Sequence, residues 1–165
     1  MPELLRLEHF GFTYPQQPRP ALADVSLTVR QGEFWVLCGA SGCGKTTLLR
    51  QLKPALRPHG AAEGRILFDG QPLDDLPPHR QAADIGFVLQ SPEEQTVTDK
   101  VWHELAFGLE SLGCDTPSIR RRVAEMASFF GIQDWFHRKV DELSGGQKQL
   151  LALASVMVLQ PRLLI

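Results

Sequence analysis

The sequence has no long apolar run, a single tyrosine, three cysteines and no marked excess of charge of either sign. Its most apolar segment, Leu150 to Leu159, is interrupted by Ser155 and is shorter than the roughly 18 residues that a membrane-spanning helix needs. Glu3 and Glu8 stand where a secretory signal would carry positive charge and then apolar residues. We therefore expect a cytosolic protein, which can still sit against a membrane protein.

The few cysteines and the balanced charge exclude several classes of protein. The cysteines, at positions 38, 43 and 114, are odd in number and form no C-x-x-C pair, which argues against a disulfide framework and a zinc site. The net charge of −2 provides no basic field, so we expect no nucleic-acid partner. The dense basic run Arg120 to Arg122 is typical of the solvated face of a helix.

Strand patterns dominate the first half of the chain. Residues 4–14 and 22–29 alternate as antiparallel strands do, and Phe34 to Cys38 is a continuous apolar run, as in a strand covered on both faces. Residues 45–52 favour a helix, which Pro54 ends. Two short strands joined by an Asp-Gly turn are predicted over residues 64–73, and another apolar strand over residues 84–90.

Helical patterns dominate from Ser91 onward. Residues 98–111 favour a helix, and residues 118–130 carry apolar side chains at helical spacing. A further helix is predicted over residues 145–159, with Ser144 as its N-cap, and Arg162 to Ile165 favours the start of a buried strand. The alternation predicts an α/β fold with a mainly parallel core sheet. We expect one domain over residues 1–165, divided into a strand-rich core (about 1–90), a helical subdomain (about 91–142) and residues 143–165.

Residues 39–47, GASGCGKTT, match the phosphate-binding pattern G-x-x-x-x-G-K-[ST] at every fixed position. Glycines let the backbone wrap an anion with its N–H groups, and the following helix directs its positive N-terminus there. Lys45 can reach the β- and γ-phosphates, and the Thr46 hydroxyl can bind Mg²⁺. A glycine-rich turn that happens to carry a lysine is the alternative. We expect nucleotide contacts from Gly39, Ala40, Ser41, Gly42, Cys43, Gly44, Lys45, Thr46 and Thr47.

A second anion-binding pattern lies in residues 143–149, LSGGQKQ. Ser144 and the free N–H groups of Gly145 and Gly146 suit the N-terminus of a helix that faces phosphate, although in isolation a simple N-cap explains them equally. Together with GASGCGKTT, this stretch resembles the ATP-binding-cassette (ABC) ATPases, whose signature is Ser-Gly-Gly-Gln at a helix start. The resemblance covers the whole chain and implies a P-loop fold of ABC type, with an antiparallel β subdomain and a helical subdomain.

The resemblance implies roles for two further residues. Tyr14 matches the aromatic residue that stacks on adenine, with a core tyrosine as the alternative. Gln90 matches the Q-loop glutamine, which bridges the Mg²⁺ site and the transporter contact, with an ordinary loop glutamine as the alternative. Residues 91–113 resemble the segment that contacts the transmembrane coupling subunit in energy-coupling factor (ECF) importers of vitamins and of nickel or cobalt ions.

The implied function is an ATP-binding and ATP-hydrolysing subunit that uses ATP and Mg²⁺ to power an ECF-like importer. It would lie peripherally at the cytoplasmic face of the membrane and bind a transmembrane coupling subunit. It would also pair with a second ABC ATPase subunit or domain, identical or different, placing Ser144, Gly145, Gly146 and Gln147 over the nucleotide of that partner.

The family pattern also places an Asp that positions Mg²⁺ and a catalytic Glu directly after the apolar strand that begins at Arg162. These positions lie beyond Ile165. General-base help typically contributes about 10²- to 10⁴-fold, so we expect residues 1–165 to bind nucleotide weakly and to hydrolyse it negligibly.

Two alternatives remain from other classes of protein. ABC ATPases of DNA repair or chromosome maintenance carry the same two motifs, usually separated by a long coiled coil. The residues between Lys45 and Ser144 contain no sustained heptad pattern, which disfavours that alternative. The other alternative is a non-catalytic nucleotide-binding module.

Overall fold

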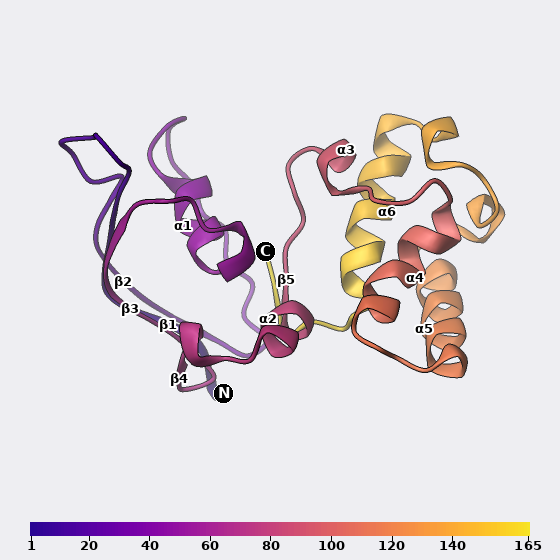
Figure 1. Ribbon diagram of the computed structural model, residues 1–165, viewed down its shortest axis with the longest axis horizontal. Helices are drawn as coiled ribbons and strands as arrows, with labels where there is room; N and C mark the ends of the chain where they lie inside the picture. The colour runs from indigo at the N-terminus through magenta and orange to yellow at the C-terminus, as the bar shows by residue number, and fades with distance from the viewer. The chain divides into compact units, whose positions relative to one another are not determined.

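An antiparallel sheet forms most of the first part of the chain, and helices predominate after residue 90 (Figure 1). This computed structural model describes residues 1–165. The strands and helices are, in chain order, β1 Glu3–Thr13, β2 Leu22–Arg30, α1 Lys45–Gln51, β3 Ala61–Phe68, β4 Gln71–Pro72, α2 Pro78–Asp84, β5 Ile85–Gly86, α3 Pro92–Gln95, α4 Val101–Ser111, α5 Thr116–Phe129, α6 Gly145–Met157 and β6 Leu163–Leu164. Short 3₁₀ turns lie at Pro54–Leu56, Leu73–Asp75, Gln133–Trp135 and Val140–Glu142.

The antiparallel sheet has the strand order β2-β1-β3-β4. β1 is its long central strand, in which Leu7 lies opposite Leu27 of β2 on one side and opposite Ile66 of β3 on the other. Leu5 and Leu7, and then Phe10 and Phe12, are buried at the period of 2 that the pattern predicts, and the register shifts between Leu7 and Phe10. The Asp-Gly turn is also confirmed, because Asp69 and Gly70 both have the positive φ that a two-residue hairpin turn requires.

The apolar run Phe34 to Cys38 does not form the predicted strand. Phe34 is 91% exposed and Val36 is 70% exposed, so the expected cover on both faces is also wrong for this chain. Apolar composition expresses a preference for burial, but a strand needs a hydrogen-bonded neighbour. None of the strands pairs with this segment, and its backbone forms no regular secondary structure.

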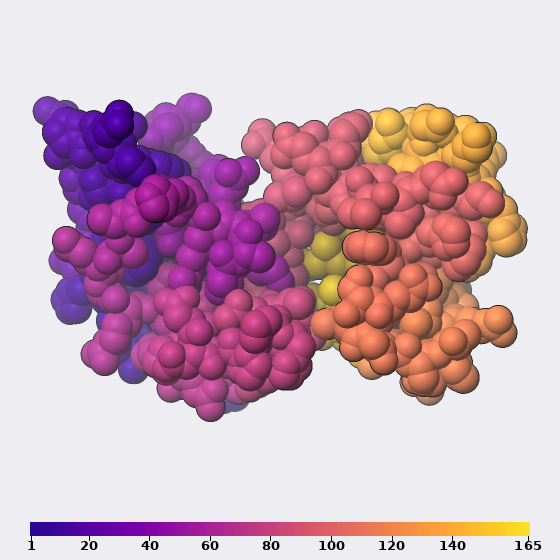
Figure 2. Space-filling view, viewed as in Figure 1, coloured from indigo at the N-terminus to yellow at the C-terminus, as the bar shows by residue number.

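The helices α4, α5 and α6 share a second hydrophobic core. α4 and α6 face each other most extensively, and α5 packs on both (Figure 1). In the space-filling view, salmon and orange residues of this unit lie in front of part of its yellow C-terminal segment (Figure 2). The core residues that are completely buried are Val101, Leu105, Leu109, Ile132, Ala154 and Val158. The apolar periodicity read from the sequence therefore describes real helix packing.

A short parallel pair, β5 and β6, represents the parallel part of the predicted sheet. The backbone N–H of Val88 donates to Ile165 and that of Ile165 donates to Gly86, as in a parallel ladder. Leu164 is 44% exposed, so the expectation of a buried final strand is only half met. Each strand of this pair has a single neighbour in the sheet, and both residues of β5 are nevertheless buried.

The chain divides into two compact units, residues 1–81 and 82–165, and the boundary falls inside α2. The antiparallel sheet, α1 and the loop before it belong to the first unit, whereas β5, β6 and the helices α3 to α6 belong to the second. No helix combines the length and the apolar character needed to cross a lipid bilayer.

Candidate functional site

The loop of residues 39–44 precedes α1 and presents an open backbone. The N–H of Cys43 donates to the carbonyl of Ala40 at 3.3 Å, which closes a turn inside the loop. Gly42 and Gly44 have φ values of 79° and 95°, in the left-handed region that favours glycine. No side chain caps the N-terminus of α1, so its first amide N–H groups remain available to an anion.

Two features of position 44 require glycine: its positive φ and the close approach of the Ala21 backbone. A Cβ atom at this position would lie 2.7 Å from the carbonyl oxygen of Ala21 and 3.1 Å from Leu22 Cδ2. Ala21 is itself fixed, because its N–H donates to the carbonyl of Phe12 at 2.8 Å. The start of α1 therefore packs tightly against the beginning of β2, and the end of β1 lies next to it.

The side chain of Lys45 folds back over the loop. Its Nζ donates to the carbonyl oxygens of Gly39 and Ala40, each at 2.8 Å, and lies 3.6 Å from the Sγ of Cys43. The cationic head thus closes the ring formed by residues 39–45 and places positive charge at its centre. Thr46 is exposed, so its hydroxyl is accessible to a metal ion that accompanies a phosphate.

Tyr14 contacts α1, the helix that follows this loop. Its Oη is 3.0 Å from the Oγ1 of Thr47, in a hydrogen bond between two half-buried side chains. Its ring meets the ring of Phe12 edge-on, with centroids 4.9 Å apart and planes at 85°. The structure therefore brings Tyr14 to the first turn of α1, through a hydroxyl contact that the sequence does not predict.

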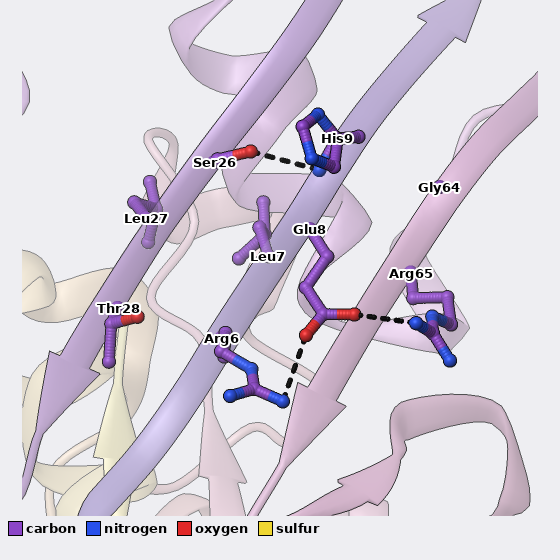
Figure 3. A pocket seen from close by; sticks show the side chains of 9 residues that line it. All are labelled: Arg6, Leu7, Glu8, His9, Ser26, Leu27, Thr28, Gly64 and Arg65. Atoms are coloured by element: carbon purple, nitrogen blue, oxygen red, sulfur yellow. Dashed lines mark hydrogen bonds and ion pairs between the residues drawn. The ribbon is translucent and has the colours of Figure 1, made fainter.

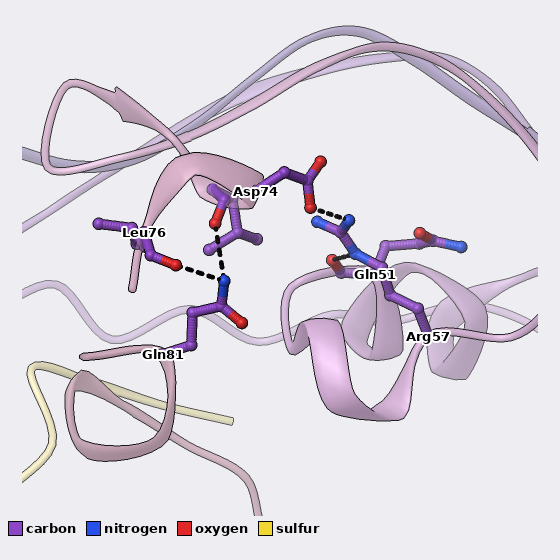
Figure 4. A network of polar contacts seen from close by, with 6 residues as sticks. Gln51, Arg57, Asp74, Leu76 and Gln81 are labelled. Atoms are coloured by element: carbon purple, nitrogen blue, oxygen red, sulfur yellow. Dashed lines mark hydrogen bonds and ion pairs between the residues drawn. The ribbon is translucent and has the colours of Figure 1, made fainter. Parts of the chain in front are cut away.

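A polar network holds the other end of α1 (Figure 4). Arg57 Nε donates to the carbonyl of Gln51 at 2.9 Å, and its guanidinium also pairs with Asp74. The Gln81 amide group donates to the carbonyl of Leu76 at 2.7 Å and ties α2 to the same segment. This network fixes the C-terminus of α1, so the loop at its N-terminus is attached to a helix anchored at both ends.

The second motif forms the N-terminus of α6. The Ser144 hydroxyl accepts from the N–H of Gln147 at 3.3 Å, and the Gln147 side-chain oxygen accepts from the N–H of Ser144 at 2.8 Å. This reciprocal capping box confirms the predicted N-cap. The Ser144 hydroxyl accepts in the box, so its own proton remains available to donate to an anion.

Gly145 and Gly146 meet no steric demand within the chain. A Cβ atom at either position would meet nothing within 4 Å, and neither residue has a positive φ. Ser144, Gly145 and Gly146 are all exposed. Glycine at these two positions therefore leaves the backbone at the start of α6 uncovered by side chains.

Gln90 is exposed and lies just after the β5 segment, in the second compact unit. Its neighbour Gln95, at the end of α3, proves to be the organising residue. Gln95 Oε1 accepts from the N–H of Leu89 at 2.9 Å, and its Nε2 donates to the carbonyl of Ala152 at 2.8 Å. The segment that carries Gln90 is thereby fastened to α6, the helix that begins at Ser144.

An ion pair strengthens this attachment. Lys148 of α6 lies 3.8 Å from the carboxylate of Glu93. The backbone N–H of Glu93 and the Ser91 hydroxyl hold the pKa of the Glu93 carboxyl below its usual value, and the charge of Lys148 adds a smaller effect. A cavity of about 390 Å³ lies between residues 93–99 and residues 139–148, on the second unit alone.

Another cavity, about 690 Å³, lies over the antiparallel sheet (Figure 3). Its charged groups pair with one another: the Glu8 carboxylate lies 2.8 Å from Arg6 and 3.0 Å from Arg65. The N–H of His9 donates to the Ser26 hydroxyl at 2.9 Å. Glu8 is therefore paired with both arginines, whereas the buried Nε of Arg6 makes no hydrogen bond.

Sequence reasoning missed Gln95 and also Glu104. Glu104 is 5% exposed, and its carboxylate accepts from the N–H groups of Val97 and Thr98 and from the Thr98 hydroxyl. It therefore shapes the loop between α3 and α4, and α4 begins at Val101 where residue 98 was predicted. The partners of this buried carboxylate are backbone N–H groups, and such contacts have no fixed spacing in a sequence. No motif could therefore have indicated the role of Glu104.

The sequence has clear relatives. A putative ABC transporter ATP-binding protein of Bacillus cereus is 47% identical over 159 residues, which make up 96% of this chain and 29% of that protein. The cobalt import ATP-binding protein CbiO of Syntrophus aciditrophicus is 36% identical over 98% of this chain and 57% of its own length. The energy-coupling factor transporter ATP-binding protein EcfA1 of Lactobacillus delbrueckii is 33% identical, with the same two coverages. The chain thus spans 29–57% of the length of these relatives.

The fold has a solved counterpart. The structure of cbiO1 from Clostridium perfringens, described as part of the ABC transporter complex cbiONQ, superposes with a TM-score of 0.85 at 28% identity, covering 99% of this chain and 64% of that one. This likeness confirms the predicted α/β fold of ABC type. The sequence profile described as ABC transporter matches residues 22–165. On the strength of this match and of the relatives above, the chain belongs to the ABC transporter family.

Proposed function

We propose that this chain is the nucleotide-binding part of an ATPase subunit that powers an ECF-like membrane importer. The observation that carries the proposal is the closed loop of residues 39–45, in which Lys45 Nζ bridges two carbonyl oxygens in front of an uncapped helix N-terminus. The relatives named for cobalt import and for energy coupling support the transport assignment.

In this proposal the loop binds the phosphates of ATP. The free amide groups at the start of α1 and the Lys45 ammonium neutralise the phosphate charge, and Lys45 exchanges part of its contact with the carbonyls of Gly39 and Ala40 for phosphate oxygens. Mg²⁺ fits this site because the exposed Thr46 hydroxyl offers an oxygen ligand; when bound, the ion polarises the γ-phosphate. Tyr14 provides a ring beside the start of α1 for the base, and Gln90 has the role in Mg²⁺ binding that the family resemblance implies.

A second copy or a related ABC subunit completes the site. The proton of the Ser144 hydroxyl and the free N–H groups of Gly145 and Gly146 bind the γ-phosphate of a nucleotide that a partner holds. The open space at both glycines supports this arrangement, since no residue of the chain itself requires glycine there. ATP would close the pair and hydrolysis would reopen it, moving the attached membrane subunits.

We also propose that the chain works at the cytoplasmic face of the membrane, as a peripheral subunit. The transmembrane coupling subunit would contact the region of residues 91–113, which resembles the corresponding segment of ECF importers. The cavity between residues 93–99 and 139–148 is a concave surface in that region.

The decisive experiment is a calorimetric titration of the chain with ATP and Mg²⁺, alongside Lys45→Ala. Because charge-assisted hydrogen bonds are worth more than neutral ones, we expect the Lys45→Ala variant to bind about 10- to 100-fold more weakly. Lys139→Ala, which removes an exposed lysine elsewhere, is the matched control and should bind as the wild type does.

Circular dichroism must show that all three proteins are folded. Equal ATP affinity in the wild type and in folded Lys45→Ala would refute the phosphate assignment.

A further inference from the structure

The hydrogen bond between Tyr14 and Thr47 joins two parts of the site that act on opposite ends of a nucleotide. Thr47 is the third residue of α1, within the turn whose free N–H groups face an anion. Tyr14 lies past the end of β1, where the base is expected. The atoms Tyr14 Oη and Thr47 Oγ1 are 3.0 Å apart.

Both partners of this bond are fixed by separate contacts. The Tyr14 ring is held edge-on against Phe12, which is 2% exposed. Gly60 allows the Phe12 ring to lie close, because a Cβ atom at position 60 would be 2.5 Å from Phe12 Cζ. The bond is therefore built into the packing and does not depend on a freely rotating surface tyrosine.

The Thr47 side is fixed by the approach of Gly44 to Ala21, which presses the start of α1 against the start of β2. A threonine in a helix usually turns its hydroxyl to a backbone carbonyl three or four residues earlier. Here the hydroxyl of Thr47 reaches Tyr14 instead. The neighbouring Thr46 is exposed, whereas Thr47 is half-buried, so the two hydroxyl groups lie in different environments.

We propose that Tyr14 is a positioning residue that acts on a bound phosphate through the hydroxyl of Thr47. Tyr14 Oη donates to Thr47 Oγ1, which leaves the proton of the Thr47 hydroxyl free to donate to a phosphate oxygen. A phosphate that accepts this proton strengthens the bond from Tyr14, and the bond in turn makes the Thr47 hydroxyl a better donor. The inference rests on the proposed nucleotide binding and adds that the tyrosine hydroxyl assists phosphate recognition, independently of the base.

This inference can be tested, because the affinity for a ligand that has phosphates but no base should then depend on the hydroxyl of Tyr14. We expect Tyr14→Phe, which keeps the ring, to weaken the binding of inorganic tripolyphosphate with Mg²⁺ by about 3- to 10-fold, the range of one net hydrogen bond. Thr47→Val should weaken it by at least as much. In a Thr47→Val background, Tyr14→Phe should change nothing further, and Thr47→Ser should restore binding.

A spectroscopic readout follows from composition. Tyr14 is the sole tyrosine of the chain, so fluorotyrosine labelling gives a single ¹⁹F resonance. We expect tripolyphosphate to shift this resonance in the wild type and to leave it unshifted in folded Thr47→Val. If Tyr14 had a purely structural role, tripolyphosphate would shift its resonance neither in the wild type nor in Thr47→Val.

The outcomes separate this inference from the proposed function. If Lys45→Ala abolishes tripolyphosphate binding while Tyr14→Phe leaves it unchanged, the coupling is wrong and the phosphate loop stands. If Lys45→Ala has no effect either, both proposals fail. Additive losses in the double variant would also overturn the coupling, because two independent contacts add.

Discussion

At the residue scale, the phosphate loop is crowded around Lys45. Its ammonium lies 3.6 Å from the Sγ of Cys43, and a Cβ atom at Gly39 would lie 2.8 Å from the same sulfur. Cys43 is nevertheless exposed. The thiol is therefore accessible to solvent, but on the side that faces the loop backbone there is little space for a group larger than hydrogen.

We therefore predict that alkylation of Cys43 with iodoacetamide blocks nucleotide binding, because the added group occupies the loop. Bound ATP should protect the thiol, and at an ATP concentration ten times the Kd the alkylation rate should fall about 10-fold by mass action. Mass spectrometry of the peptide that contains Cys43, followed by calorimetry of the modified chain, measures both effects.

Cys38 is also exposed, so the experiment needs Cys38→Ser as the background. Cys43→Ser should bind ATP and resist the reagent. Unchanged ATP affinity after complete alkylation of Cys43 would show that the loop does not hold the nucleotide near this residue, and a structural packing role would then suffice.

At the scale of elements, α6 makes two different sets of contacts. Its N-terminus is held by a capping box, and its middle accepts the side chain of Gln95 at the Ala152 carbonyl. Gln95 Nε2 also lies 3.4 Å from Ser155 Oγ. Residues 89–95 and α6 are thus attached to each other through one amide side chain and the Glu93–Lys148 ion pair.

We predict that Gln95→Leu loosens this attachment. It leaves the Leu89 N–H without its acceptor, a loss of about 1–3 kcal/mol for a buried group. The Leu89 amide should then exchange with deuterium roughly 5- to 100-fold faster, by the same energy range. Hydrogen exchange with peptide-level mass spectrometry over residues 86–95 measures it.

Two further variants sharpen this test. Gln95→Glu keeps an acceptor for the Leu89 N–H but cannot donate to Ala152, so it should restore protection at Leu89 alone. Gln133→Ala changes an exposed glutamine in the same unit and should leave exchange unaltered. Unaltered exchange at Leu89 in Gln95→Leu would mean that the segment is held by other contacts.

At the scale of the whole molecule, the two motifs lie in different compact units. The loop of residues 39–45 belongs to the unit of residues 1–81, and Ser144 belongs to the unit of residues 82–165. Each unit has its own buried residues, among them Leu5 and Phe68 in the first and Leu105 and Leu151 in the second. Each motif is therefore supported by the core of its own unit.

The proposed two-site pairing predicts complementation between defective chains. Ser144→Arg should retain ATP but obstruct a partner's nucleotide, while Lys45→Ala should lack nucleotide but offer an intact signature. A mixture of the two variants can form one complete composite site, so we expect ATP-dependent heterodimers that are weaker than wild-type dimers. Analytical ultracentrifugation with ATP and Mg²⁺ measures them.

Each variant alone should stay monomeric, and Gln133→Ala should pair as the wild type does. ATP-dependent dimers of Ser144→Arg alone, as stable as those of the wild type, would contradict a signature that faces the partner's nucleotide.

The sequence by itself determined the parts of this protein that rest on local chemistry. The phosphate loop needs glycines at fixed positions before a helix, the cap of α6 needs Ser144 and Gln147 three residues apart, and the β3–β4 turn needs Asp69-Gly70. Each of these depends on backbone geometry within a few residues, so spacing alone reveals it. The antiparallel strands and the helix faces followed likewise from periods of 2 and 3.6 residues.

Tertiary structure alone decided the contacts between distant residues and the fate of apolar segments. Phe34 to Cys38 has the composition of a buried strand, but strand formation depends on a neighbour that no local pattern specifies. The bond from Tyr14 to Thr47 and the bridge from Gln95 to Ala152 span 33 and 57 positions. Such pairs depend on how β1 packs with α1 and how α3 packs with α6. A hydrogen bond between distant residues requires a short distance and a favourable angle between donor and acceptor, and a local sequence pattern specifies neither.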